Sequence, residues 1–263
     1  MGLLTGLHRH DRAIVVALLL GVMLAAWSYL LVGVEMPMPE TVGMAMPMEA
    51  PGWSIGHFLL MLAMWSAMMA AMMLPSAVPM LLFYDSIAQK RGGPAIGPSV
   101  VGLTALFALG YLIVWFCFSI GAVVLQYVLD RASLLSPLMQ ATSTVLAGVI
   151  LIGTGLYQWT PLKQACLHHC RSPLDFVLTQ WQSGNGGALS MGLRHGAFCL
   201  GCCWMLMLLL FVGGVMNFAW IAGIALFVLA EKLSPAGHWI GKAAGLALIA
   251  WGGLVLASLA PAP

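Results

Sequence analysis

The chain is poor in charged residues. Asp, Glu, Lys and Arg make up only 7% of its 263 residues, whereas soluble globular domains contain about 25%. The formal net charge is +2 and the sequence has no basic run, which argues against nucleic acid as a partner. Hydrophobic residues reach 62%. The composition therefore predicts a polytopic membrane protein whose main partner is the lipid bilayer.

The sequence also lacks the motifs of several enzyme classes. It contains no P-loop, no dinucleotide fingerprint, no nucleophile elbow and no paired-carboxylate site. Carboxylates are nearly absent from the apolar runs, which argues against a proton-coupled carrier. The one near a run, Glu231, is expected to pair with Lys232 or to reach the membrane interface. Uphill pumping by this chain alone is not expected, and a non-enzymatic role is favoured, although an enzyme remains open.

A disulfide framework is not expected. Six cysteines are present, five of them between residues 166 and 203, and none lies in a segment predicted to be outside the cell. Secreted domains place paired cysteines on the oxidising side of the membrane. The thiols are therefore interpreted as reduced groups available for metal binding or redox chemistry.

Apolar runs predict an all-α bundle of about seven transmembrane helices, with six as the alternative. The runs lie at 13–34, 55–83, 100–128, 141–159, 196–215, 217–231 and 239–258. The first run is longer than the apolar core of a signal peptide, so an uncleaved helix is expected. The whole chain, 1–263, is predicted to be a single transmembrane domain in a bacterial inner membrane.

The distribution of basic residues predicts the orientation. Of the ten Lys and Arg residues, only Arg131 falls on a predicted outer loop when the N-terminus is cytoplasmic, and cytoplasmic loops carry an excess of these residues. This orientation places a Met-rich loop, 35–53, outside the cell. It places a Cys/His-containing loop, 160–194, inside.

The outer loop contains a group of methionines in an extended, proline-rich segment. They are Met36, Met38, Met44, Met46 and Met48, accompanied by three acids and no base. Thioether sulfur is a soft ligand that suits Cu(I), and the acids attract cations. The loop is interpreted as a site of metal capture, with a flexible linker as the alternative.

The apolar run at 55–83 carries seven methionines. Four share one face of a helix: Met61, Met64, Met68 and Met72. The other three, Met69, Met73 and Met80, lie on a neighbouring stripe. Pro75 and Pro79 are expected to bend the helix, as happens where a helix lines a pathway. Met64, Met68 and Met72 are interpreted as metal ligands along a path, and ordinary packing is the alternative.

A further group of candidate ligands lies at the start of the fifth run. His195, Cys199 and Cys202 or Cys203 recur at helical spacing, so that they share one face within two turns. Imidazole with two or three sulfurs suits Cu(I) or Zn(II). The alternative is that these cysteines act as small hydrophobic residues.

The inner loop carries the last group of candidate ligands, Cys166, His168, His169 and Cys170. On a helix Cys166 and Cys170 share a face. A single C-x₃-C is less specific than a pair of C-x₂-C motifs. A site shared by Cys166, Cys170, His195 and Cys199 is a hypothesis, because the sequence does not show whether the two groups meet.

Three segments resemble a bacterial family of unknown function, predicted to be metal-binding integral membrane proteins. They run from Met64 to Pro75, from Thr160 to Pro173 and from Gly192 to Trp204. The resemblance extends over nearly all of the chain beyond the outer loop. It implies an inner-membrane protein with a metal site.

The preferred interpretation is a soft-metal protein of the inner membrane that acts in metal transport or delivery. Cu(I) is favoured because thioethers select it, and Zn(II) is the alternative. The expected partners are the metal ion and a metalloenzyme or metallochaperone that receives it. One alternative is a thiol–disulfide oxidoreductase that uses the cysteines of the fifth run. Another is an assembly partner of a membrane metalloenzyme complex, which would pack through small residues such as Gly241 and Gly245.

Overall fold

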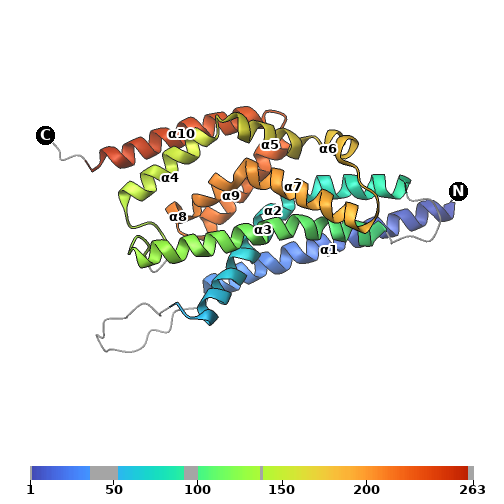
Figure 1. The fold of residues 1–263 in the computed structure, drawn as a ribbon, viewed down its shortest axis with the longest axis horizontal. Helices are drawn as coiled ribbons and strands as arrows, with labels where there is room; N and C mark the ends of the chain where they lie inside the picture. The colour runs from blue at the N-terminus through green and yellow to red at the C-terminus, as the bar shows by residue number, and fades with distance from the viewer. Residues whose placement is uncertain (1, 36–52, 92–99, 137–138, 260–263) are drawn as a thin grey trace.

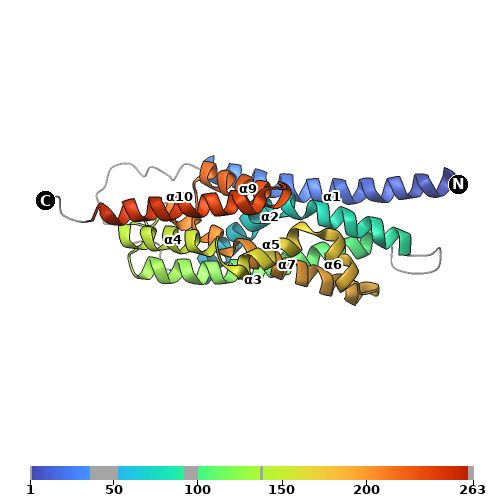
Figure 2. The same cartoon turned by 90° about the horizontal axis from the view of Figure 1, so that it is seen from above.

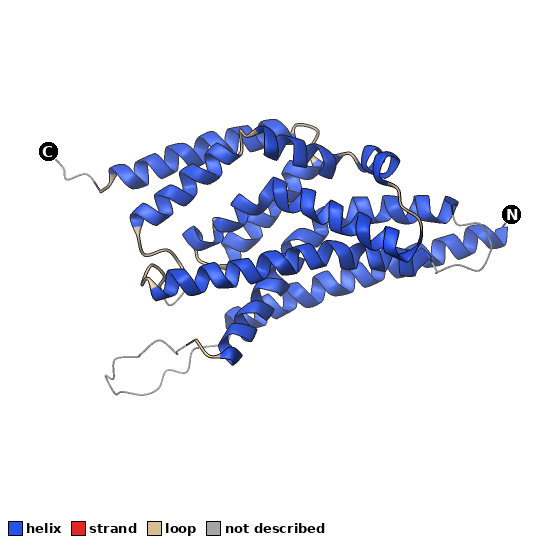
Figure 3. Ribbon diagram, in the orientation of Figure 1, coloured by secondary structure: helices blue, strands red, loops and turns tan. Residues whose placement is uncertain are grey.

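The chain folds into a bundle of helices (Figures 1 and 3). The computed structural model describes residues 2–35, 53–91, 100–136 and 139–259, and these ranges contain no β-strand. The helices are α1 (Gly2–Glu35), α2 (Ile55–Arg91), α3 (Val100–Arg131), α4 (Thr144–Tyr157), α5 (Pro161–Arg171), α6 (Pro173–Gln180), α7 (Gly184–Leu208), α8 (Leu210–Gly213), α9 (Phe218–Leu233) and α10 (Gly237–Ala257). The predicted all-α class is confirmed.

Long and short helices differ in how far they extend along the molecule. Helices α1, α2, α3 and α7 run along the long axis, whereas α4 and α10 occupy the half in which α10 ends (Figures 1 and 2). With 32 residues, α3 is about 48 Å long, against about 30 Å for the hydrocarbon core of a bilayer. Helices α4 and α9 have only 14 and 16 residues. The long helices therefore project beyond the level at which the short ones end.

Several segments are long and apolar enough to cross a membrane. Five helical segments meet this condition in the described ranges, and a sixth is added if α4 and α5, bent by 64°, count as one broken span. Helix α9 is shorter than the ~20 residues usually needed. Helix α7 begins at Gly184, well before the predicted start of the fifth run at residue 196, because the glycine-containing segment before that run forms its first turn. The count of seven spans remains a prediction.

Glycines allow α3 and α7 to approach each other closely. A Cβ added to Gly110 would lie 2.5 Å from the carbonyl oxygen of Leu189, and one added to Gly192 would overlap the carbonyl of Phe107. Backbones in contact are the usual result of small residues at a helix interface. The close approach brings Tyr111 of α3 against the middle of α7.

Helices α4 and α10 also pack through glycines. A Cβ at Gly155 would lie 2.6 Å from the carbonyl oxygen of Gly245, and one at Gly241 would overlap the carboxylate of Glu231. The small faces that the sequence offered for packing on a partner protein are therefore covered within the chain at Gly241 and Gly245. The contacts of these glycines within the chain therefore weaken the alternative that the protein is an assembly partner of a membrane metalloenzyme complex.

Helix α2 contains both prolines and changes direction near its middle (Figure 1). Proline removes a backbone donor and displaces the carbonyl four residues earlier, which bends a helix. Next to Pro75, the hydroxyl groups of Ser76 and Tyr111 donate to the carbonyl oxygen of Met73 at 2.8 Å and 3.0 Å. The bend and these contacts fix the position of Met73 in the core.

A buried polar network joins the adjacent ends of the short helices. Lys163 of α5 forms an ion pair with Glu231 of α9 at 2.7 Å and also donates to Gln158 at the end of α4. Arg171 donates to the carbonyl oxygens of Ser234 and Pro235, between α9 and α10, at 2.5 Å and 2.9 Å. The expected pairing of Glu231 with its sequence neighbour is therefore wrong. The carboxylate is held by a lysine from α5, 68 residues away in sequence.

Candidate metal site

Helix α5 presents two cysteines to α7. Its first turn is fixed by Pro161 and by Thr160, whose hydroxyl accepts a hydrogen bond from the backbone N–H of Lys163 at 3.3 Å. This is a normal helix start, in which a side chain satisfies an otherwise unpaired donor. Cys166 and Cys170, four residues apart, then lie on one side of the helix. Both pack against the hydrophobic core.

Helix α7 contributes three buried cysteines at the level of α5. Cys199, Cys202 and Cys203 are each at most 1% exposed. The sulfur of Cys170 lies 3.9 Å from that of Cys202, so the two cysteine groups found in the sequence meet in the fold. We refer to Cys170, Cys199, Cys202, Cys203 and the thioether of Met73 together as the sulfur cluster.

Cys199 lies at the centre of the sulfur cluster. Its carbonyl oxygen accepts hydrogen bonds from the thiols of Cys202 and Cys203 at 3.0 Å and 2.9 Å. The hydroxyl of Tyr111 is 3.1 Å from the Cys199 sulfur. In the described residues no three cysteine sulfurs lie within 4.8 Å of one another, so the thiols would have to move toward one ion to bind it together.

A lysine completes the surroundings of Cys199. The ammonium of Lys232 donates to the Cys199 sulfur at 2.9 Å and to the hydroxyl of Ser76 at 3.1 Å. Lys232 is 6% exposed and, within the described ranges, forms no ion pair with a carboxylate. Burying an unpaired charge is costly, so this ammonium favours negative charge on the cluster.

The thioether that contacts the cysteines is Met73. The thiol of Cys203 lies 3.8 Å from its sulfur. The predicted ligands Met64, Met68 and Met72 are buried in the core along the same helix. Met73 belongs to the stripe next to the one singled out from the sequence, one residue beyond Met72. Helical periodicity identified the methionine-rich side of α2 but not the residue that reaches the cysteines.

Cys166 lies at the rim of the sulfur cluster. It is half-buried, and its sulfur would be 2.6 Å from a Cβ added to Gly201 of α7. The absence of a side chain at position 201 therefore lets Cys166 pack directly on α7. Cys166 is placed to join the cluster from its edge rather than from its centre.

His195 lies one turn before Cys199 and is 3% exposed. Its ring is stacked on Tyr111 at a centroid distance of 5.7 Å and meets Phe176 edge-on at 5.5 Å. Among the buried side-chain atoms that the structure describes, its Nδ1 has no hydrogen-bond partner. Buried nitrogens are normally paired, so this atom is available as a ligand.

His168 and His169 face away from the sulfur cluster. They lie with Asp175 of α6 in a group whose ligand atoms are all within 4.8 Å of one another. His169 also stacks on Phe198 at 4.3 Å. These histidines come from the same helix as Cys166 and Cys170, yet the fold separates them from the thiols. The predicted ligands of the inner loop therefore fall into two places.

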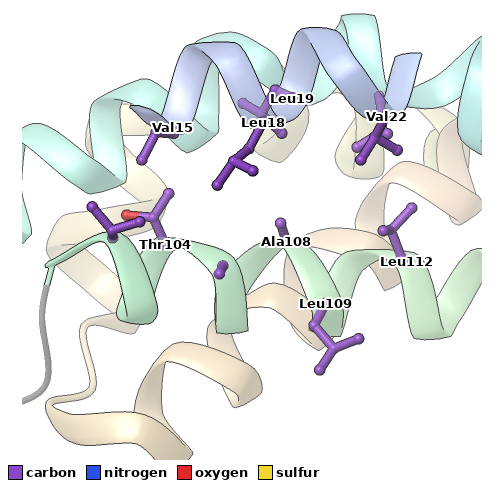
Figure 4. Close-up of a pocket in the computed structure, with 11 residues that line it drawn as sticks. Val15, Leu18, Leu19, Val22, Thr104, Ala108, Leu109 and Leu112 are labelled. Atoms are coloured by element: carbon purple, nitrogen blue, oxygen red, sulfur yellow. The ribbon is translucent and has the colours of Figure 1, made fainter. Parts of the chain in front are cut away.

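Two other regions do not form part of this site. The methionines of the outer loop, Met36, Met38, Met44, Met46 and Met48, lie outside the described residues. An apolar groove of about 250 Å³ runs between α1 and α3 and is lined by residues such as Val15, Leu19 and Ala108 (Figure 4). Its lining has no sulfur, imidazole or carboxylate, so it offers no ligand for a soft metal.

Sequence reasoning missed Tyr111 and Lys232, which contact the Cys199 sulfur, and Ser76, which accepts a hydrogen bond from Lys232. Lys232 was counted among the bases of the inner side, and Tyr111 and Ser76 were not singled out. A lysine that follows an apolar run without a nearby acid on its own face is a weak signal of a buried anionic partner. No signal in the sequence marked Tyr111, because its position depends on the glycine contacts between α3 and α7.

The fold and this site define an all-helical protein with a buried cluster of thiols and one thioether. A search of curated proteins and a search of solved structures each found no match. The model of the PpoB2 family, described as a copper chaperone, matches residues 62–255. The chain therefore belongs to the PpoB2 copper chaperone family, which agrees with the resemblance to metal-binding proteins noted from the sequence. The matched range includes all five residues of the sulfur cluster.

Proposed function

We propose that this chain binds Cu(I) in the sulfur cluster and delivers it to a protein acceptor from within a bacterial inner membrane. The observation that carries the proposal is the meeting of α5 and α7 at the sulfurs of Cys170 and Cys202, 3.9 Å apart, with the thioether of Met73 from α2 beside Cys203. The copper chaperone family supports the choice of cargo. The cluster is the place in the described structure where several soft donors meet.

Charge favours Cu(I) over a divalent ion at this cluster. Two thiolates and one Cu(I) carry a net charge of −1, which the ammonium of Lys232 neutralises. Zn(II) with the same two thiolates and the ammonium would leave an excess positive charge in a buried site, which is unfavourable. Thioether ligation by Met73 also suits Cu(I). Zn(II) remains the alternative cargo if more thiolates take part.

The buried methionines of α2 support a route to the cluster. Met64, Met68 and Met72 are each at most 8% exposed and follow one another at intervals of one turn. Thioethers bind Cu(I) more weakly than thiolates do, so an ion would gain affinity as it approached Cys199. The route ends in the cluster, and His195 is placed to take part in the last step.

The helix lengths support a membrane location. Five helical segments are long and apolar enough to span a bilayer, and α1 begins at the end of the bundle opposite to that at which α10 ends (Figure 1). With the N-terminus cytoplasmic, the sulfur cluster lies near the cytoplasmic side, where α9 ends and α5 begins. Delivery to a cytoplasmic or membrane-bound acceptor fits this position.

Thiol–disulfide exchange is the second candidate. The distance of 3.9 Å between the sulfurs of Cys170 and Cys202 would permit a disulfide after small movements. Such an enzyme needs a thiolate that its substrate can reach. Because Cys199, Cys202 and Cys203 are at most 1% exposed, a protein disulfide has no route to them. The burial that weakens this candidate is compatible with binding a small ion.

Metal content of the purified protein tests the proposed function. The variant Cys199→Ser with Cys202→Ser should lose the copper that the wild type retains, because it removes the central thiols. Cys117→Ser is the matched control, since Cys117 is an exposed thiol on α3 outside the cluster. Mass spectrometry after reconstitution with Cu(I) under reducing conditions should give about one copper per chain in wild type and control. Copper retained by the double variant would refute the site.

A further inference from the structure

A pair of thioether sulfurs, those of Met61 and Met139, lies apart from the sulfur cluster. Met61 is about three turns before Met73 along α2. The side-chain nitrogen of Gln126, on α3, donates to the sulfur of Met61 at 3.5 Å and to the sulfur of Met139 at 3.2 Å. Met139 belongs to the segment between α3 and α4. One buried amide therefore contacts two soft donors that come from different parts of the chain.

The orientation of the amide is fixed by a tryptophan. The indole N–H of Trp65 donates to the side-chain oxygen of Gln126 at 2.7 Å. Because an indole nitrogen can only donate, the oxygen of the amide must face Trp65 and its nitrogen must face the sulfurs. Lone pairs of both sulfurs consequently point toward one position, now taken by the amide nitrogen.

The backbone around Met139 carries strain to achieve this arrangement. Met139 has φ 56°, a left-handed conformation that is unfavourable for a side chain of this size. The segment is held there by hydrogen bonds from the Met139 N–H to Ser136 and from the Ala141 N–H to the carbonyl of Phe211, at 2.8 Å and 2.7 Å. Strained residues of this kind gather at functional sites.

We propose that Met61 and Met139 form a separate low-affinity site for a soft monovalent cation, Cu(I) or its analogue Ag(I). A cation at the point where the sulfur lone pairs converge would be held by two thioethers, the ligand type that Cu(I) favours. Methionine side chains are flexible enough to close on an ion smaller than the amide group. Gln126 is a positioning residue that holds the two sulfurs apart when no cation is bound.

The location of this pair defines its role. Met61 lies twelve residues before Met73 in sequence, about 18 Å along a helix. It lies near the end of the bundle where α2 begins. Trp53, just before α2, donates to Asp130 at 2.8 Å, and Asp130 is one turn beyond Gln126 on α3. Residues 36–52, which contain the five methionines of the outer loop, precede α2 in the sequence.

The pair is therefore the first buried binding site that copper occupies before it reaches the sulfur cluster. Met64, Met68 and Met72 lie between the two sites along α2. The cation-binding property of the pair is independent of the thiols, whereas its role as a supplier rests on the proposed function. Two measurements separate these two claims.

The first measurement is carbon NMR of the full-length protein with ¹³C-labelled methionine methyl groups, titrated with Ag(I). Resonances of Met61 and Met139, assigned from Met61→Leu and Met139→Leu, should shift in wild type and equally in Cys199→Ser with Cys202→Ser. The methyl of Met80, a buried methionine beyond the sulfur cluster, should not shift. Unshifted Met61 and Met139 resonances at saturating Ag(I) would overturn the site, whatever the thiols do.

The second measurement is the rate at which Cu(I) reaches the thiols, followed by the thiolate–copper absorbance in the ultraviolet. The variant Met61→Leu with Met139→Leu should load about tenfold more slowly, equivalent to about 1.4 kcal/mol, and reach the same final occupancy. Met80→Leu with Met191→Leu is the matched control, because both residues are buried on the other side of the cluster. Equal rates in the two variants would overturn the supplier role. Failure of the proposed function would show instead as no thiolate–copper absorbance in any protein.

Discussion

Two buried lysines differ in what neutralises them. Lys163 is fully buried and forms an ion pair with Glu231, so its charge is compensated by a carboxylate. Lys232, the next residue after Glu231, donates to a cysteine sulfur and to a serine hydroxyl. The first lysine closes a structural network at the helix ends, whereas the second places its positive charge beside the sulfur of Cys199.

The comparison shows how a buried site can be prepared for a cation. A carboxylate in the sulfur cluster would neutralise Lys232 and add a hard oxygen ligand that suits other metals. Because the carboxylate of Glu231 pairs with Lys163 of α5 instead, the cluster keeps its sulfur donors and the positive charge of Lys232. Adjacent residues on α9 therefore separate the structural ion pair from the proposed metal site.

The largest effect is expected from breaking the structural pair. Glu231→Gln should lower the free energy of unfolding by about 3–5 kcal/mol, because it leaves the ammonium of Lys163 buried without a counter-charge. Chemical denaturation of the detergent-purified protein measures this loss. Adding Lys163→Met to Glu231→Gln should recover part of the stability. The folded fraction should still bind copper, and a stable Glu231→Gln protein without copper would invert the assignment of the two lysines.

A smaller effect on folding and a larger one on copper are expected at the other lysine. Lys232→Met should weaken Cu(I) binding by about 10–100-fold, the range seen when groups around a metal site are removed. The ratio of Cu(I) to Zn(II) affinity should also fall, because the charge balance that favours a monovalent ion is lost. Competition with a Cu(I) chelator measures both. Lys242→Met, a lysine outside the cluster, is the control, and equal affinities in the two variants would remove Lys232 from the site.

The smallest effect is expected at the thioether. Met73→Leu keeps the volume of the side chain, so stability should change by less than about 1.5 kcal/mol. Copper affinity should fall only a few-fold, because the thiols remain. Met72→Leu, one residue earlier and also buried, should leave the equilibrium affinity unchanged. If Met72→Leu weakens binding and Met73→Leu does not, the stripe singled out by periodicity contains the ligand after all.

The sequence predicted the type of fold and the chemistry of the site better than its geometry. Apolar runs and helical spacing identified the helices, the methionine-rich side of α2 and the facing cysteines of α5 and α7. The meeting of Cys170 with Cys202 could not be predicted, because it depends on the 64° bend between α4 and α5. The contact of Tyr111 with Cys199 depends on Gly110 and its fit against α7.

Local sequence rules failed where tertiary contacts decide. Glu231 and Lys232 looked like a pair because they are neighbours, but adjacent residues on a helix point in different directions. The glycines at the start of α7 permit close packing of its first turn, because a Cβ at Gly187 would lie 2.5 Å from the carbonyl oxygen of Gln182. His168 and His169 looked like partners of the nearby cysteines, and the helix directs them elsewhere.

X-ray absorption at the copper edge tests the central claim most directly. The account predicts that Cu(I) bound to the wild-type protein has a first shell dominated by sulfur, and that this shell loses sulfur in Cys170→Ser as well as in Cys199→Ser. Loss in both variants would show that α5 and α7 hold one ion together. A shell of nitrogen and oxygen that neither substitution changes would contradict the account and move the copper to another part of the chain, such as His168, His169 and Asp175.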